Sequence, residues 1–232
     1  MLVTQMRFPM GGKSETERCS VANEKVREEN VQKTIDAGIQ CFISDGIDKT
    51  QLQYVAVKAG LSKRSCLRYF GNKEQFVIAV LKSINVKSYQ TGRAYYQKVT
   101  EQFASAPDRL RALMEITGEY FLAHPEVFML LSEGQAYLQR TASHLKISGQ
   151  YTLLYDYWPS VVLSLMKQGT EEGSITRFPQ DYLQKDEAGA LWYSYVGLLV
   201  QLAYASSLGN YSKEDCAETI RRFIERNLQS LN

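Results

Sequence analysis

The sequence predicts an all-α fold, and three observations lead to it. Apolar residues recur at three- and four-residue spacing, as in Val31, Ile35 and Ile39 near the N-terminus. No segment shows the strict alternation of apolar and polar residues that is typical of a half-buried strand. Many glycines and prolines fall between the periodic segments, where they end helices.

The chain has 232 residues, enough for a small domain followed by a medium one. We predict a flexible N-terminal extension at 1–24, a three-helix helix-turn-helix domain at 25–75, and a helical domain at 76–232. The extension is polar, contains a Gly-Gly pair and shows little periodicity, so little holds it in one structure.

The helices follow from their apolar stripes and from the residues that end them. The first runs from about 25 to 44 and stops at Asp45-Gly46, where glycine suits a left-handed cap. Two short helices follow, one with Thr50 as its N-terminal cap and one capped by Ser62. The remaining helices are predicted at about 73–104, before His124-Pro125, at 126–132, at 134–168 with a kink at Pro159, at 186–208 and at 213–230, with a loop over 169–185.

Charge and cysteine content exclude several classes of protein. The formal net charge is +2, so a charged partner must be sought in local charge. The four cysteines form no CxxC pair and only two histidines are present, which argues against a zinc site or a disulfide framework. We predict no metal and no cofactor. No catalytic constellation or phosphate-binding loop appears, so an enzyme is not expected.

The apolar part of the N-terminus is too short for a signal peptide, and we expect a reducing cytoplasm. Residues 188–212 carry no formal charge, but Ser194 and Gln201 interrupt the run and no Lys/Arg-rich flank accompanies it. We predict that this helix is buried on most sides and that the chain has no membrane partner, with a single membrane span as the alternative.

A helix-turn-helix is predicted at residues 50–70, from two short helices and the tight turn between them. Ala56 is small enough for a close crossing of the helices, and Gly60 lies in the turn four residues later. Leu61 and Cys66 supply apolar contacts beneath the second helix.

Local charge in this region is positive. Five basic residues and no acidic residue lie between positions 58 and 73. Basic side chains on a recognition helix neutralise phosphates and release counterions, and arginine also reads guanine O6 and N7. The segment therefore predicts a double-stranded DNA operator as partner, with a solvated basic hairpin inside a larger bundle as the alternative. The predicted DNA-binding residues are Thr50, Gln51, Ser62, Lys63, Arg64, Ser65, Arg68, Tyr69 and Lys73.

Particular roles are predicted for three of these residues. Thr50 and Lys73 lie at helix N-termini, where backbone amides and the helix dipole favour a phosphate. Tyr69 is expected to give its hydroxyl to a phosphate while its ring packs inward.

A linked series of residues follows the first apolar stripe: CFISDG, Thr50, AGLSKRS, Tyr69-Phe70 and Lys73-Glu74. With this series, residues from about 27 to 81 resemble the DNA-binding domain of the TetR family of bacterial regulators. The resemblance implies that the domain at 76–232 binds a small-molecule effector and dimerises.

The recognition helix departs from the residues that the family often has there, which are Gly, Thr, Leu, Tyr and His. Loss of the usual tyrosine at Leu67 removes one expected contact with DNA. Arg64 and Arg68 are expected to restore affinity and to shift the base preference, so the operator is not inferred from relatives. The five residues at these positions are Arg64, Ser65, Cys66, Leu67 and Arg68.

The helices near 186–208 and 213–230 are candidates for a dimer interface. We predict that they form a two-fold four-helix interface in a homodimer, and the alternative is that both only close the core of one chain. The apolar stripe of the last helix consists of Ala217, Ile220, Phe223, Ile224, Leu228 and Leu231.

Aromatic residues crowd the predicted effector domain, and such residues line small-molecule pockets while offering a few polar groups. We predict a small apolar or aromatic effector, with ordinary core packing as the alternative. Asp156 either faces solvent or faces the pocket and attracts a cationic ligand. The predicted ligand-binding residues are Tyr120, Phe121, Tyr151, Tyr155, Trp158, Trp192 and Tyr195.

The function predicted from these features is a transcriptional regulator, a repressor that its effector releases from DNA. The alternative is a DNA-binding structural or adaptor protein of the same fold without a small ligand. Cys66 adds two hypotheses: a redox switch whose thiol pKa Arg64 and Arg68 lower, or a buried apolar residue that holds the recognition helix down.

Overall fold

The computed structural model describes residues 15–141, 149–177 and 185–231, with the backbone alone at 15–22, 99, 149–156 and 185. Every regular element within these ranges is a helix, so the all-α prediction is confirmed. The helices are α1 (Glu15–Asp45), α2 (Leu52–Lys58), α3 (Lys63–Phe70), α4 (Lys73–Thr100), α5 (Ala106–Ala123), α6 (Pro125–Thr141), α7 (Gly149–Glu171), α8 (Lys185–Ser207) and α9 (Lys213–Gln229).

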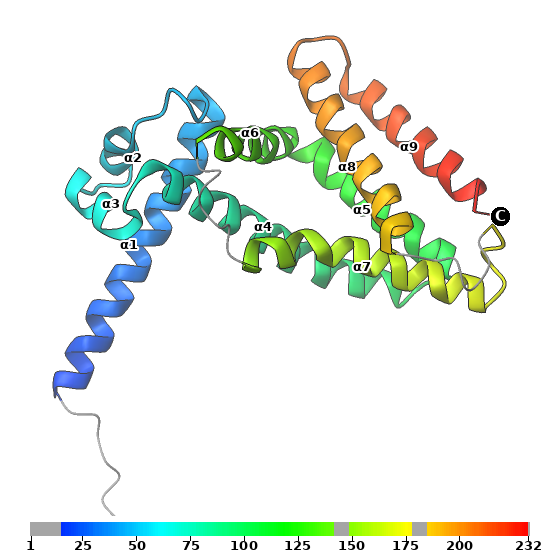
Figure 1. Ribbon diagram of the computed structural model, residues 1–232, viewed down its shortest axis with the longest axis horizontal. Coiled ribbons are helices and arrows are strands. Elements are labelled where there is room, and N and C mark those ends of the chain that lie inside the picture. Colours follow the sequence, from blue (N-terminus) through cyan, green and yellow to red (C-terminus); the bar gives the residue numbers. More distant parts are fainter. Residues whose placement is uncertain (1–14, 142–148, 178–184, 232) are drawn as a thin grey trace, which may run out of the picture.

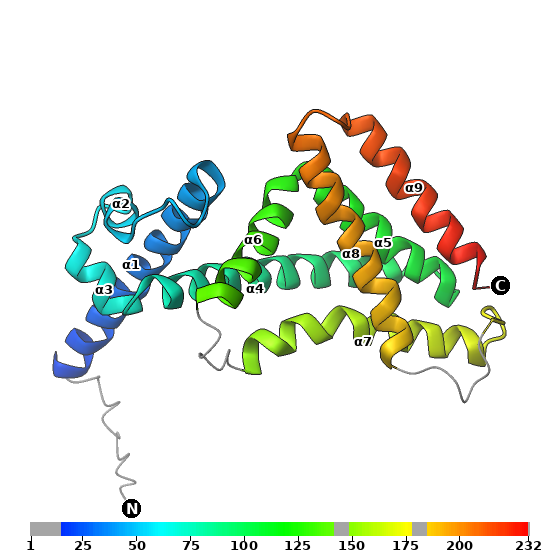
Figure 2. The same cartoon turned by 45° about the horizontal axis from the view of Figure 1, so that its top comes forward.

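The helices form two groups that share α4. Figures 1 and 2 show α1, α2 and α3 at one end of the molecule and the C-terminus at the other. Helix α4 runs from the first group into the second, where α5, α6 and α7 pack against it (Figure 2). Helices α8 and α9 pack on these helices and on each other.

Helix α1 begins earlier than predicted. It starts at Glu15 rather than near 25, so residues 15–24 are helical and not an irregular extension. This segment contains no glycine or proline, so its residues favour a helix without forming an apolar stripe. Residues 23–29 are exposed to solvent, which explains why no hydrophobic pattern marked them.

The predicted division into helices at 126–132 and 134–168 is wrong. Helix α6 continues through Gly134 to Thr141, and α7 begins at Gly149, with Pro159 inside it. The glycine at 134 does not end a helix: an added Cβ there would lie 2.5 Å from Leu81 Cδ2. Glycine is required at this position by close packing, which the local sequence does not reveal.

One of the two predicted N-terminal caps is correct. Ser62 Oγ accepts a hydrogen bond from the Ser65 amide at 3.1 Å, which caps α3 as predicted. The residue that caps α2 is Gln51, not Thr50. The Thr50 side chain is buried and donates to the Gly46 carbonyl at 2.7 Å, so it closes the α1–α2 turn instead.

The predicted turn between α2 and α3 is confirmed. Gly60 has φ +71°, a conformation that glycine adopts without steric cost. The Leu61 amide donates to the Ala56 carbonyl at 2.8 Å, and Ala56 is fully buried where the two helices cross.

Two hydrophobic cores hold the chain, and α6 contributes to both. The first joins Phe42, Val55 and Phe76 of the N-terminal helices with Leu130 and Leu138 of α6. The second lies among α5, α7, α8 and α9 and includes Phe128 of α6. Helix α6 therefore ties the N-terminal group to the body.

The charge-free segment forms α8, which is buried along one face. Tyr193, Ser194 and Gln201 are exposed, so burial on most sides is not seen within one chain. Tyr195 and Leu199 have no exposed surface. Across the described ranges, none of the helices combines the length and the apolarity that a bilayer crossing requires.

Cys66 lies beneath α3 and has no exposed surface. Burial raises the pKa of its thiol, whereas a redox switch would need Arg64 and Arg68 to lower it. The structure contradicts the redox-switch hypothesis and favours the buried apolar residue that holds the recognition helix down.

Replacing Gly134 by alanine is expected to destabilise the fold by about 1–3 kcal/mol, since Leu81 is fully buried and must move as a whole. Denaturant unfolding followed by circular dichroism measures the change. Gly197→Ala is the control, because a Cβ at this helical position meets no atom within 4 Å. It should leave stability unchanged or raise it by up to ~1 kcal/mol. Equal losses in both variants would contradict the packing argument.

Cys66 is expected to resist alkylation in the folded chain at pH 8, because its thiol is buried and its raised pKa leaves little thiolate. Peptide mapping by mass spectrometry after iodoacetamide treatment measures the modified fraction. The same chain in guanidinium chloride is the control and should react fully. Rapid alkylation of Cys66 without unfolding would show that the thiol is accessible.

Candidate functional site

Helix α3 presents one exposed basic face. Lys63, Arg64 and Arg68 are exposed, while Cys66 on the opposite side is buried in the core. These positions lie on one side of the helix because of its 3.6-residue period. Leu67 lies among them with 38% of its surface exposed, which leaves an apolar contact on the same face.

The positive charge on α3 is not neutralised within the described part of the chain. No ion pair there involves Lys63, Arg64 or Arg68. Arg68 Nη2 donates to the Tyr69 hydroxyl at 3.4 Å and lowers the pKa of that phenol. Unpaired exposed cations on one short helix attract a polyanion.

Two predicted DNA-binding side chains are engaged inside the protein. Thr50 is 3% exposed, so its hydroxyl cannot reach a phosphate from this position, and the prediction for this side chain is wrong. Lys73 Nζ donates to the Asp48 carbonyl at 2.9 Å and lies 5.4 Å from the centre of the Tyr137 ring. Burial lowers the pKa of Lys73. Lys73 therefore fastens the start of α4 to the α1–α2 turn.

The remaining predicted DNA-binding residues lie on or beside the exposed face. Gln51 is exposed and its side chain makes no capping bond. Ser62 and Ser65 bond to each other at the start of α3, with their hydroxyl oxygens 3.0 Å apart. Tyr54 of α2, which is not among the predicted residues, is 54% exposed. The sequence indicates this exposure, because Tyr54 is not part of the apolar stripe formed by Leu52, Val55 and Ala56.

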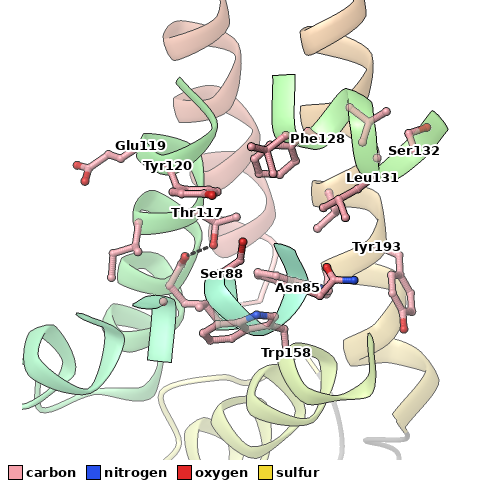
Figure 3. A pocket seen from close by; sticks show the side chains of 18 of the residues that line it. Asn85, Ser88, Thr117, Glu119, Tyr120, Phe128, Leu131, Ser132, Trp158 and Tyr193 are labelled. Atoms are coloured by element: carbon pink, nitrogen blue, oxygen red, sulfur yellow. Dashed lines mark hydrogen bonds between the residues drawn. The ribbon is translucent and has the colours of Figure 1, made fainter. Parts of the chain in front are cut away.

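A pocket of about 630 Å³ lies among α4, α5, α6, α7 and α8 (Figure 3). This volume is within the range of small-molecule sites. The lining residues are Asn85, Ser88, Thr91, Gly92, Tyr95, Leu113, Ile116, Thr117, Glu119, Tyr120, Val127, Phe128, Leu131, Ser132, Gln135, Trp158, Trp192, Tyr193, Val196, Gly197, Val200 and Gln201.

Two stacked indoles form one wall of the pocket. The rings of Trp158 and Trp192 lie 5.9 Å apart with 30° between their planes. Gly92 of α4 makes room for the first indole, because a Cβ there would lie 3.2 Å from Trp158 Cζ2. Aromatic walls of this kind hold flat or apolar ligands.

The structure places the predicted ligand-binding residues in three groups. Tyr120, Trp158 and Trp192 line the pocket, as expected. Phe121 and Tyr195 do not line it, so these two predictions are wrong: Phe121 is buried in the core, and the Tyr195 hydroxyl donates to the Met114 carbonyl at 2.6 Å. The side chains of Tyr151, Tyr155 and Asp156 lie outside the described residues.

The polar wall of the pocket was not predicted. Asn85 and Ser88 lie one turn apart on α4, and Ser132 and Gln135 lie one turn apart on α6. Asn85 Nδ2 is buried and has no hydrogen-bond partner among the described residues. Polar residues at three-residue spacing on α4 were the signal in the sequence, but only the packing shows that they face a pocket.

Helix α6 also holds the α1–α2 turn. Glu133 accepts a hydrogen bond from the Ile47 amide at 2.7 Å, and Arg140 pairs with Asp48 at 3.0 Å. Ile47 is fully buried. Residues on either side of Glu133 on α6, such as Ser132 and Gln135, line the pocket. One rigid helix thus contacts both the pocket and the helix-turn-helix group.

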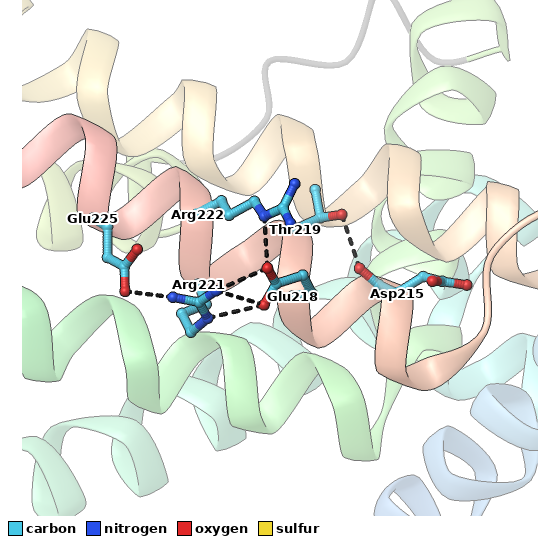
Figure 4. Close-up of polar contacts among 6 residues, drawn as sticks. All are labelled: Asp215, Glu218, Thr219, Arg221, Arg222 and Glu225. Atoms are coloured by element: carbon cyan, nitrogen blue, oxygen red, sulfur yellow. Dashed lines mark hydrogen bonds and ion pairs between the residues drawn. The ribbon is translucent and has the colours of Figure 1, made fainter.

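The outward face of α9 is charged. Arg221 pairs with Glu218 and Glu225, and Arg222 pairs with Glu218 (Figure 4). The apolar stripe faces the other way: Ile220, Ile224 and Leu228 are buried against the core of the same chain. The prediction that this stripe forms the dimer interface is therefore wrong for these three residues.

Comparison with known proteins gives one sequence family. Residues 35–80 match the sequence model of the bacterial regulatory proteins of the tetR family. This range covers the end of α1, both helices of the helix-turn-helix and the start of α4. No curated protein sequence matches the chain.

Several solved structures share the fold along most of the chain. The fatty acid degradation regulator FadR of Bacillus halodurans has a TM-score of 0.63 at 16% identity, over 87% of this chain and 99% of its own. FadR of Bacillus subtilis in complex with stearoyl-CoA gives 0.62 at 15% identity, over 87% and 99%. PfmR of Thermus thermophilus, a TetR family transcriptional regulator, gives 0.60 at 18% identity, over 86% and 98%.

The family match falls on the helix-turn-helix, and the shared fold extends over the helical body behind it. The solved structures named above are all of regulators. Residues 35–80 therefore carry the sequence pattern of the tetR family of bacterial regulatory proteins, on a helical body that shares the fold of solved regulators.

Proposed function

We propose that this regulator is a repressor that binds its operator as a homodimer and leaves it when a small apolar or aromatic effector occupies the pocket among α4–α8. Two features support the proposal: an exposed basic face on α3 and an aromatic-lined pocket. The pocket favours an effector-responsive regulator over an adaptor protein with a filled core.

Helix α3 enters the major groove in this proposal. Arg64 and Arg68 are exposed where a recognition helix meets base edges, and each presents a fork that matches guanine. The phosphate contacts come from Gln51, Ser62, Lys63, Ser65 and Tyr69, with Tyr54 added from its exposure on α2.

A dimer is required because one recognition helix covers only a half-site. The surface that we propose for dimer contact lies on α8 and the α8–α9 turn, where Tyr193, Leu208 and Tyr211 are exposed. Exposed apolar side chains favour association.

Helix α6 is the element through which we propose that ligand binding affects DNA binding. Its inner face lines the pocket, and its Glu133 and Arg140 hold the α1–α2 turn. Because packed helices shift as rigid bodies, a ligand that displaces α6 also changes the position of the recognition helix. The B. subtilis structure, which shares this fold, contains stearoyl-CoA, a ligand with a long apolar acyl chain.

The test begins with selection of a duplex from a random DNA pool, followed by anisotropy measurements with that duplex. A bacterial metabolite extract added to the complex should release the DNA. Failure to select any sequence would refute DNA recognition, and release by no extract fraction would refute the role of an effector.

Arg64→Ala and Arg68→Ala are each expected to weaken binding to the selected duplex by ~1–3 kcal/mol and to relax the base preference at one position. The reason is the loss of paired hydrogen bonds to a base edge. Anisotropy titrations against single-base variants of the duplex measure both effects.

Arg222→Ala is the matched control, because it removes the same charge from α9. It should leave DNA affinity nearly unchanged. If all three variants lose affinity equally for every sequence, α3 contributes only general electrostatic attraction.

Glu133→Ala is expected to loosen the α1–α2 turn, since the buried Ile47 amide loses its acceptor at a cost of about 1–3 kcal/mol. Hydrogen exchange at Ile47 should accelerate and DNA affinity should fall. Arg140→Ala, which breaks an exposed ion pair, is the control and should have a small effect. Unchanged exchange at Ile47 would show that α6 does not hold the turn.

A further inference from the structure

The charge of the pocket limits the ligands that it can hold. Among the described lining residues, Glu119 alone carries a formal charge, and none is basic. Figure 3 shows the Glu119 carboxylate pointing away from the pocket. An ionised group packed against these walls would lose part of its hydration without gaining a counter-charge, which is costly.

One polar group in the pocket lacks a partner. Asn85 Nδ2 is buried and donates to no described residue, although Asn85 belongs to the polar wall of α4. Buried donors in folded proteins are nearly always paired, and an unpaired one costs free energy comparable to a lost hydrogen bond. A ligand whose acceptor atom takes a hydrogen bond from this amide removes that free-energy cost.

The other side chains around Asn85 are mostly apolar or neutral. The Thr117 hydroxyl already donates to the Leu113 carbonyl at 2.9 Å, while Ser88 lies one turn from Asn85. Leu131 and the stacked Trp158 and Trp192 supply apolar walls. The pocket walls therefore favour an uncharged ligand that offers a hydrogen-bond acceptor to Asn85.

We infer that the effector is a neutral, largely apolar molecule with a carbonyl or ether oxygen that accepts a hydrogen bond from Asn85 Nδ2. The inference rests on the proposed function of the pocket and deepens it. It also separates this chain from the B. subtilis FadR complex, because stearoyl-CoA carries anionic phosphates for which the described pocket offers no cation. Neutral ketones and esters fit the described walls, and free fatty carboxylates do not.

Binding can be measured directly, because Trp158 and Trp192 are the only tryptophans in the chain and both line the pocket. Tryptophan fluorescence of the full chain is titrated with four probes of equal chain length: dodecan-2-one, dodecane, dodecanoate and dodecanoyl-CoA. The ketone should bind at least tenfold more tightly than dodecanoate or the CoA ester. Tighter binding of either anion, or no binding of the ketone, would overturn the inference.

Asn85→Leu tests the hydrogen bond at nearly constant side-chain volume. It should weaken ketone binding about tenfold and leave dodecane binding unchanged or stronger, since only the ketone uses the amide. Asn227→Leu is the matched control on α9, where the amide donates to the Phe223 carbonyl outside the pocket. Circular dichroism confirms that each variant is folded. Equal loss of ketone and dodecane binding in Asn85→Leu would show that Asn85 only shapes the pocket.

The outcome is separable from that of the proposed function. If dodecanoate binds more tightly and also releases the selected DNA, an effector-responsive repressor stands and the neutral-ligand inference falls. If the ketone binds through Asn85 but never changes the affinity for DNA, the neutral-ligand inference is supported and the proposed coupling through α6 is refuted.

Discussion

The close contact of α6 with α4 at Gly134 and Leu81 is the constraint on which the other features depend. No side chain fits at position 134, because even a Cβ would lie 2.5 Å from Leu81. This contact fixes the depth of α6 between the two cores. Residues two to four positions from Gly134 then reach the N-terminal core, through Leu130 and Leu138, and the pocket, through Ser132.

This position of α6 explains why a pocket and a DNA-binding surface can communicate in one small chain. Glu133 bonds to Ile47, and the neighbouring Ser132 lines the pocket. The turn that Glu133 holds is also closed from within by Thr50 and from α4 by Lys73. Thr50 and Lys73, which the sequence predicted to contact phosphates, therefore stabilise the group of helices that carries α3.

The two surfaces differ in the physics of recognition. The α3 face is exposed and cationic, so its attraction to DNA is long-ranged and depends on salt. The pocket is almost uncharged, so its selectivity comes from shape and from one unpaired amide, Asn85. A neutral effector adds no charge of its own to the protein, and its influence on DNA must pass through the position of α6.

Local signals in the sequence determined the helical fold, the Gly60 turn, the Ser62 cap and the basic face of α3, because each depends on residues within one or two turns. The tertiary structure alone decided which side chains face the pocket. Phe121 and Tyr195 were predicted to contact a ligand because they are aromatic, but both are buried in the core. Asn85 is not aromatic and was not predicted, yet it lies in the pocket wall. The reason is that the burial of a side chain depends on which distant helices meet it, as Leu81 meets Gly134, and such contacts leave no local pattern.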